Sequence, residues 1–289
     1  MHDNPQAAAS NAFALPGHRL ITLEGRDAIA FSQAQFMNDL ALLESGQWQW
    51  SGWLTPKGRV IALFALLKMS DEAVWLVLPD ADPHAVAVAL QRFVFRSKVG
   101  ILVRDDLKVS GTFTPPAQAR GNAIGGDAQA GIELDMGSEA SPRTLRLGTD
   151  APPARTEAIA RWQACDLEHG LPRLSASQVE HWTPQQLSLE RLRAFSVKKG
   201  CYPGQEIVAR THFLGQAKRG LALLEADAPM DPGMEVSAGA VALGKIVASG
   251  HDGTRSVALA VLPLERDASL LLVGMVPARE RALLDGLAR

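Results

Sequence analysis

The sequence predicts an α+β protein with a separate, all-β unit at its C-terminal end. Segments typical of strands cluster between residues 47 and 78, and helix-start signals at Asp27 and Asp82 flank that cluster, which indicates strands packed against a few helices. After Lys218, short apolar runs alternate with turns, a pattern that favours a small antiparallel barrel or sandwich. With 289 residues, the chain is long enough for two or three compact units.

A hairpin is expected in the first of these units. Gln47–Leu54 and Arg59–Lys68 are joined by Thr55-Pro56-Lys57-Gly58, in which Pro and Gly stand where a tight turn prefers them. Residues 60–67 are apolar at every position, which predicts a strand that is covered on both faces. Further strands are expected at Ala73–Leu78 and Ile101–Thr112.

Four helices are expected from capping residues, at Asp27, Asp82, Thr156 and Thr183. Pro83 suits the first helical position, and Thr183-Pro184-Gln185-Gln186 has Gln at the capping-box position. The expected helices run from these four residues to about Asn38, Phe95, His169 and Arg193, respectively. Between residues 114 and 155 the sequence is rich in Pro, Gly and Ala, and we expect a loose connection with short strands at Ile132–Leu134 and Thr144–Leu147.

The composition is that of an ordinary globular protein. Hydrophobic residues make up 47% and charged residues 21%, and 29 basic against 31 acidic side chains give no general attraction to nucleic acid or membrane. The segment Met1–Leu20 lacks a cationic start followed by an apolar core, and the longest apolar run is too short to span a bilayer as a helix. Two cysteines provide neither a disulfide framework nor a four-thiolate metal site. We therefore expect a cytoplasmic protein, or at least one in a reducing compartment.

The strongest local signal surrounds Cys201, which lies between Gly200 and Gly204. From Arg191 to Arg219 the sequence has seven cations and one anion, Glu206. Nearby cations favour the thiolate, the form that attacks electrophiles or binds metals, and a helix beginning near Gly204 would add the positive end of its dipole. Cysteine also packs as a small buried hydrophobe, and a run of cations is often a solvated face. For Cys165 we expect core packing.

The segment Lys199-Gly200-Cys201-Tyr202-Pro203-Gly204-Gln205-Glu206 resembles the K-G-C-Y-x-G-Q-E signature of the YgfZ-type folate-binding proteins. These are relatives of the glycine-cleavage T-protein that serve the maintenance of iron–sulfur proteins. Supporting stretches are Gln35–Asp39, Ser51–Arg59, Arg92–Arg96 and Thr183–Gln186. The resemblance implies two intertwined ferredoxin-like α/β units around a central opening, plus a C-terminal β-barrel. The expected units are 1–115, 116–215, which carries the signature, and 216–289.

The resemblance also implies tetrahydrofolate in the central opening. Glu168 would hold the pterin, because a carboxylate can accept two parallel hydrogen bonds from its amino group and ring N–H. Arg210 and other basic residues would meet the glutamate tail, and Tyr202 would stack on a ring or simply fill core.

The same resemblance assigns roles within the signature. Cys201 would be the essential thiol, with Lys199 and Arg210 as its electrostatic support. The glycines Gly200 and Gly204 would set the backbone shape, and Gln205 and Glu206 complete the motif.

Two departures from the T-protein pattern bear on the reaction. The run Ile61-Ala62-Leu63 stands where the T-protein has its catalytic acid, so that Ala62 and Leu63 disfavour aminomethyl transfer. Ser188 stands where related folate proteins often have Asn.

The leading hypothesis is a folate-binding accessory factor for synthesis or repair of iron–sulfur enzymes, including those that modify tRNA. Its partners would be folate and iron–sulfur enzymes or their assembly machinery, with neither a membrane nor direct nucleic-acid binding expected. The alternatives are a folate-dependent one-carbon transferase or demethylase and a non-catalytic RNA-binding or docking protein.

Overall fold

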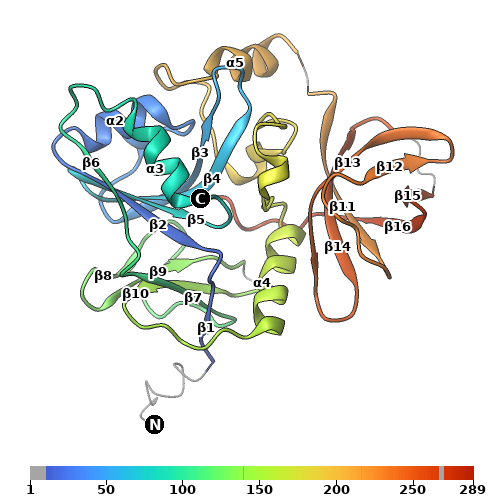
Figure 1. Ribbon diagram of the computed structural model, residues 1–289, viewed down its shortest axis with the longest axis horizontal. Helices are drawn as coiled ribbons and strands as arrows, with labels where there is room; N and C mark the ends of the chain where they lie inside the picture. The colour runs from blue at the N-terminus through green and yellow to red at the C-terminus, as the bar shows by residue number, and fades with distance from the viewer. Residues whose placement is uncertain (1–10, 139, 216, 267–269) are drawn as a thin grey trace.

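The computed structural model describes residues 11–138, 140–215, 217–266 and 270–289 (Figure 1). Two sheets lie on one side of a central helix and a closed barrel lies on its other side, which confirms the α+β class with a C-terminal barrel. Half of the segment inspected for a secretion signal, residues 1–10, lies outside the described residues. The helices are α2 (Ala28–Gln35), α3 (Pro83–Gln91), α4 (Thr156–Glu168) and α5 (Gln205–Phe213).

The first sheet has the strand order β3-β4-β5-β2-β6. Its strands are β2 (Arg19–Glu24), β3 (Gln47–Leu54), β4 (Val60–Ser70), β5 (Ala73–Leu78) and β6 (Gly100–Val103). The expected hairpin is confirmed as β3 and β4. Phe64 of β4 packs in a core with α2 and α3, whereas Leu63 belongs to the central core on the opposite face. Burial between two cores explains why β4 is apolar at consecutive positions.

The second sheet has the order β1-β7-β10-β9-β8. Its strands are β1 (Phe13–Ala14), β7 (Lys108–Thr112), β8 (Gly125–Asp127), β9 (Gly131–Asp135) and β10 (Thr144–Gly148). The two short strands expected between residues 114 and 155 are confirmed as β9 and β10, and β8 was not foreseen. Because β1 and β7 come before residue 115 and join the sheet of the later strands through the pairing of β7 with β10, the two α/β units are intertwined.

The prediction of one strand over Ile101–Thr112 was wrong. That segment forms β6 in the first sheet and β7 in the second sheet. Arg104 folds back on Asp106 through two hydrogen bonds of 2.8 and 2.7 Å at the turn between them. In the sequence, Asp105 and Asp106 interrupt an apolar pattern. Such an interruption does not show that the chain passes from one sheet to another at this point.

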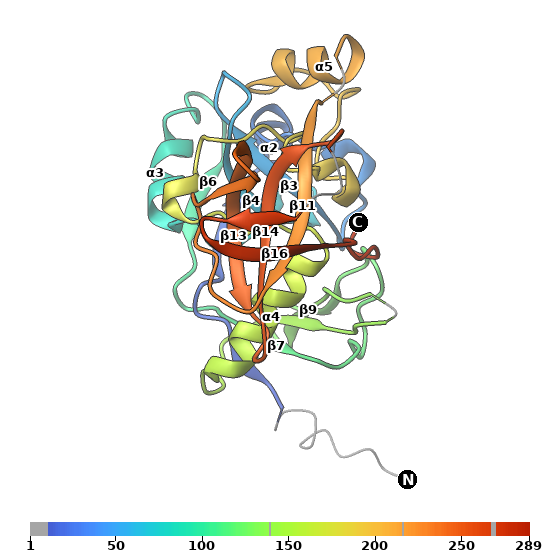
Figure 2. The same cartoon turned by 90° about the vertical axis from the view of Figure 1, so that its right-hand side faces the viewer.

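Helix α4 lies between the second sheet and the barrel (Figures 1 and 2). The barrel closes in the order β11-β14-β13-β12-β15-β16, which decides between the barrel and the sandwich that the sequence left open. Its strands are β11 (Arg219–Ala226), β12 (Glu235–Ala238), β13 (Val241–His251), β14 (Ser256–Pro263), β15 (Leu271–Val273) and β16 (Val276–Arg281). Beyond β16 the chain returns to the α/β part, where the Trp50 indole donates a 2.7 Å hydrogen bond to the Leu287 carbonyl.

The four expected helices had different outcomes. Helix α3 begins at Pro83 with Asp82 as its cap, although it ends at Gln91, and α4 has nearly the expected bounds with Arg155 rather than Thr156 as its N-cap. The prediction that the Asp27 side chain caps α2 was also wrong, since its carboxylate accepts a hydrogen bond from the Lys98 N–H instead.

The prediction of a helix from Thr183 to about Arg193 was wrong. Thr183 and Gln186 do make reciprocal capping-box bonds of 3.0 and 3.3 Å. Only a short 3₁₀ turn follows, at residues 189–192, because Ser188 and Arg193 take left-handed conformations that a right-handed helix cannot contain. Among the described residues, none of the helices combines the length and the apolar composition that a membrane crossing needs.

Candidate functional site

The signature segment forms a closed loop immediately before α5. The Tyr202 hydroxyl donates a 3.1 Å hydrogen bond to the Ser196 carbonyl, and the side-chain amide of Gln205 donates one of 2.9 Å to the Lys199 carbonyl. These bonds span Cys201, whose side chain is exposed. The thiol is therefore accessible on a backbone that its neighbours fix. Cys165, by contrast, is buried on α4, as expected.

Lys199 points into the protein and holds this loop to α2. Its ammonium donates bonds of 2.6, 2.5 and 3.0 Å to the carbonyls of Gln33, Phe36 and Asn38 at the end of that helix. An ammonium has three N–H donors, so all of them are used. Burial lowers the pKa of Lys199 to about 8, and the nearby Asp39 carboxylate opposes that shift. The geometry gives Lys199 an anchoring role, and its electrostatic support of the thiol stays a prediction.

Gly204 allows the loop to touch the tip of the β3–β4 hairpin. Its φ is +79°, and a Cβ there would lie 2.6 Å from the Thr55 carbonyl oxygen and 2.7 Å from the Gly58 Cα. A larger residue would meet both a strained backbone and a steric clash. Gly200 differs, because a Cβ at that position would meet nothing within 4 Å. The chain itself therefore requires glycine at position 204 and not at position 200.

The other residues of the signature region divide between core and surface. Tyr202 is buried, burial raises the pKa of its phenol, and its ring packs in the central core. Of the two roles expected for Tyr202, the structure shows the filling of the core. Glu206 and Arg210 are exposed on α5. Folate contacts by Tyr202 and Arg210 remain predictions.

Glu168 lies at the end of α4 and lines a cavity of about 190 Å³ between that helix and the barrel. The other walls come from the barrel and the C-terminal segment, namely Leu223, Glu225, Arg255, Val257, Arg281, Ala282 and Leu284. Within the described part of the chain, the Glu168 carboxylate makes neither a hydrogen bond nor an ion pair. Burial raises its pKa, and Arg255 partly opposes this shift. A half-buried carboxylate without a partner is suited to accept bonds from a ligand.

Two residues earlier, Asp166 belongs to a buried ion-pair network that the sequence did not reveal. Its two oxygens lie 2.7 Å from Arg143 and 3.2 Å from Arg173, and Arg173 continues to Asp80 at 2.7 Å. The Arg143 guanidinium also lies 4.6 Å from the centre of the Trp162 ring. The network joins α4 to both sheets. In the sequence, Asp166 is only an acidic residue between apolar neighbours in an expected helix. That pattern does not indicate with which residues it pairs.

The two halves of the predicted site lie on different parts of the molecule. Cys201, Tyr202 and Arg210 are not among the residues that line the Glu168 cavity. Helix α5 lies at the periphery, whereas α4 lies in the middle (Figures 1 and 2).

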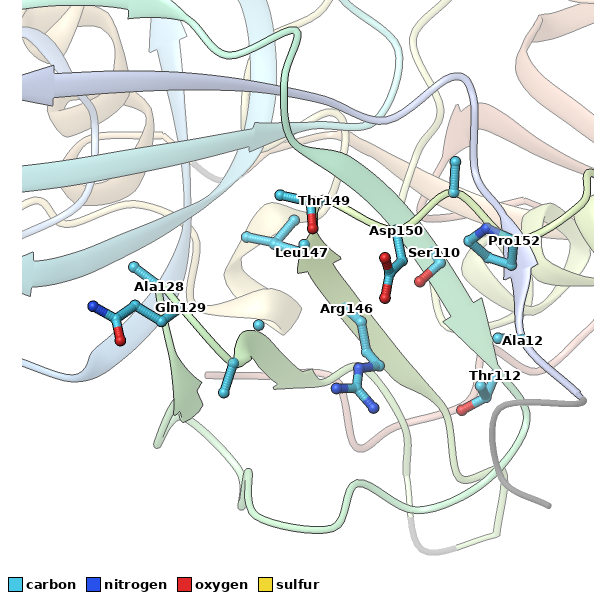
Figure 3. Close-up of a pocket in the computed structure, with 14 residues that line it drawn as sticks. Ala12, Ser110, Thr112, Ala128, Gln129, Arg146, Leu147, Thr149, Asp150 and Pro152 are labelled. Carbon is cyan, nitrogen blue, oxygen red and sulfur yellow. The ribbon is translucent and has the colours of Figure 1, made fainter. Parts of the chain in front are cut away.

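A larger cavity, of about 600 Å³, lies on the outer face of the second sheet (Figure 3). Ser110, Arg146 and Asp150 project into it, and Arg146 lies 3.5 Å from the Glu133 carboxylate. Its lining includes no residue of the signature.

Proteins similar to this chain were found among curated sequences. The tRNA-modifying protein YgfZ of Vibrio vulnificus strain YJ016 is 31% identical over 281 residues, which covers 88% of this chain and 85% of the relative. The chain belongs to the YgfZ family. The protein of the same name from Sodalis glossinidius is 27% identical over 235 residues, covering 74% of this chain and 70% of the relative. No family model matches the chain.

The glycine cleavage system aminomethyltransferase T from Bartonella henselae is a structural neighbour of this YgfZ-family chain. It has a TM-score of 0.70 and 17% identity, covering 93% of this chain and 84% of that chain. The likeness shows a shared fold. At the first departure, Ala62 and Leu63 are buried apolar residues of β4. At the second, Ser188 accepts a 2.9 Å bond from the Leu221 N–H and so ties the preceding turn to the first barrel strand.

Proposed function

We propose that this protein is a cytoplasmic, tetrahydrofolate-binding accessory factor for the synthesis or repair of iron–sulfur enzymes, including enzymes that modify tRNA. The names of its YgfZ relatives associate that family with tRNA modification. The proposal assigns the essential chemistry to the Cys201 thiol and ligand binding to Glu168. It extends beyond the names of the relatives in both respects.

The observation that carries the proposal is the presentation of Cys201. The thiol is exposed, while hydrogen bonds on both sides of it fix the loop and the Lys199 side chain anchors the loop to α2. A sulfur that only filled space would be buried, as Cys165 is. One thiolate provides a single ligand, whereas an iron–sulfur cluster needs about four, so a cluster in contact with Cys201 would need ligands from a partner.

The Glu168 cavity fits the pterin end of a folate. A pterin offers two adjacent N–H donors, and the Glu168 carboxylate has no partner among the described residues. The apolar side chains of Leu223 and Val257 provide surfaces for the ring. When bound, tetrahydrofolate supplies a reduced pterin that can carry a one-carbon unit. Glu168 would hold and orient that ring.

The decisive experiment tests the thiol in cells. A bacterial strain that lacks its own YgfZ is complemented with the wild type, Cys201→Ala or the control Cys165→Ala, and iron–sulfur-dependent tRNA modifications are measured by mass spectrometry. We expect Cys201→Ala to fold normally and fail to restore the modifications, while Cys165→Ala restores them. Full rescue by Cys201→Ala would remove the thiol from the proposal.

Ligand binding is tested separately by calorimetric titration with tetrahydrofolate. Glu168→Gln keeps the size of the side chain but replaces one acceptor oxygen with a donor, and we expect a loss of affinity of at least about tenfold. Glu157→Gln, at the exposed first turn of the same helix and outside this cavity, is the matched control. Equal affinity of wild type and Glu168→Gln would exclude Glu168 from the site.

The fold of the aminomethyltransferase neighbour favours one-carbon transfer as a second candidate function. Ala62 and Leu63 oppose it, because neither can move a proton at the reacting nitrogen. Formation of methylene-tetrahydrofolate from a methylamine-type substrate would support this alternative over the accessory role. A non-catalytic RNA-binding role predicts instead a tRNA affinity that falls steeply with salt and is unaffected by Cys201→Ala.

A further inference from the structure

Helix α5, which follows the Cys201 loop, has an outward face that is exposed among the described residues. Val208 is the one buried residue in this helix, and Ile207 beside it packs against Gly58 of the β3–β4 hairpin. On the side opposite Val208, Glu206, Arg210, Phe213 and Leu214 fall within a sector of about 100° at 3.6 residues per turn, and Ile207 borders this sector beside Leu214. We call these four residues the α5 stripe. All four are exposed.

The apolar end of the α5 stripe is unusually exposed. Phe213 is 65% exposed and Leu214 is 85% exposed, and they are adjacent in sequence. The ring of His212 meets the Phe213 ring edge-on at 4.9 Å, which limits the rotation of Phe213 in the absence of a partner. Single exposed apolar residues are common on protein surfaces. A pair that continues from a reactive loop along one helix face is better explained by a partner that covers it.

The charge around the α5 stripe indicates the chemistry of that partner. Lys199 and one guanidinium nitrogen of Arg219 donate hydrogen bonds to carbonyl oxygens, and Arg191 pairs with Asp285. The remaining cations of the segment are exposed and make no ion pair within the described residues: Arg193, Lys198, Arg210 and Lys218. They outnumber the two nearby carboxylates, Glu206 and Glu190, the latter of which interacts electrostatically with His212 of α5, so this surface is complementary to an acidic one.

We propose that the α5 stripe is the docking surface for a protein partner that presents an apolar pocket rimmed by carboxylates. The inference rests on the proposed function, since docking there brings the partner against the Cys201 thiol. The open space beside Gly200 leaves room for the approaching chain next to that thiol. Leu214 and the Glu206 carboxylate favour a protein over RNA, because RNA binding relies on cations and stacking aromatic residues.

The test removes the apolar end and leaves the thiol in place. Phe213→Ser combined with Leu214→Ser is compared with Val241→Ser combined with Met275→Ser, two barrel residues that are 62% and 90% exposed. We expect both variants to keep the thermal midpoint and the tetrahydrofolate affinity of the wild type. The α5 variant should lose complementation as completely as Cys201→Ala, and the barrel variant should retain it. Normal rescue by the α5 variant would overturn the proposal.

A second measurement identifies the class of partner. A photo-crosslinking amino acid replaces Leu214 in cells, with and without Arg210→Glu. We expect an adduct that protease destroys, and a yield that falls about tenfold or more in Arg210→Glu, as for a charge at the centre of an interface. An adduct destroyed only by ribonuclease, or bulk tRNA binding that the Phe213/Leu214 variant abolishes, would make the partner an RNA and overturn the proposal. If Cys201→Ala rescues normally while the α5 variant does not, the thiol chemistry fails and the docking surface remains.

Discussion

The C-terminal end of α4 and the loop before α5 have the same arrangement built from different interactions. In each, two titratable side chains stand two residues apart, and one points inward and is fully paired while the other has no partner or is exposed. On α4, Asp166 forms ion pairs with Arg143 and Arg173, whereas Glu168 faces a cavity. In the loop, the Lys199 ammonium donates hydrogen bonds to carbonyl oxygens, whereas Cys201 is exposed.

The difference lies in how the inward residue is held. Asp166 is fixed by buried ion pairs that reach both sheets, so removing it leaves the Arg143 charge unpaired inside the protein. Lys199 is fixed by neutral carbonyls at the end of one helix, so that the anchor of the loop is more local. The comparison indicates that α4 is secured by the assembly of the units, whereas the loop is secured by a single helix end and a hairpin. Four substitutions test this difference between α4 and the loop.

The largest effect is expected for Asp166→Asn. The neutral amide leaves Arg143 without its buried counter-charge, while Arg173 keeps its pair with Asp80, and we expect a loss of about 3–5 kcal/mol in the free energy of unfolding, measured by urea denaturation. The control is Asp285→Asn, whose ion pair with Arg191 is at the surface and should be worth about 1 kcal/mol or less. Equal effects of the two substitutions would contradict a structural role for the network.

A smaller loss, of about 2–3 kcal/mol, is expected for Lys199→Met, because the buried carbonyls at the end of α2 lose their donor. Lys198→Met is the matched control, since Lys198 is exposed and should change stability by about 0.5 kcal/mol or less. Hydrogen exchange of the 196–205 amides should accelerate in Lys199→Met alone. Unchanged exchange would show that the loop does not depend on this anchor.

Gly204→Ala is expected to cost about 1–3 kcal/mol, because alanine resists a φ of +79° and its Cβ would approach the Thr55 carbonyl. Gly200→Ala is the control within the same loop and should be nearly neutral for stability. Thermal unfolding measures both. If the two variants were equally stable, the contact between the loop and the hairpin would not matter.

The smallest effect, and one of opposite sign, is expected for Glu168→Gln. Burial raises the pKa of Glu168 above its ordinary value of 4.5, so this group favours the folded state only at low pH, and that contribution is lost as pH rises through the folded-state pKa. Glu168→Gln should therefore stabilise the protein at pH 7, by less than about 1 kcal/mol because solvent reaches the carboxylate. The gain should shrink below pH 4.5. A variant less stable than wild type at pH 7 would show that Glu168 has a stabilising partner.

Sequence reasoning succeeded where the signal is local. The Pro-Gly turn between β3 and β4 and the Asp82-Pro83 helix start are patterns of adjacent residues, and both are confirmed. The helix after Thr183 shows the limit, because its capping box forms and the helix still fails at Ser188. The free energy by which a capping box favours a helix is small compared with that of the packing that positions Ser188 against β11.

Short stretches of the sequence were enough to predict the α+β class, an all-β unit at the C-terminal end and the segment that carries Cys201, because periodicity, turn residues and motifs involve near neighbours in the chain. The packed structure was needed to show that the C-terminal unit closes into a barrel, that Asp166 pairs with two buried arginines, that Lys199 faces a helix end and that β6 and β7 belong to different sheets. Each of these depends on groups far apart in the chain, and their burial and charge pairing exist only once the units have packed together.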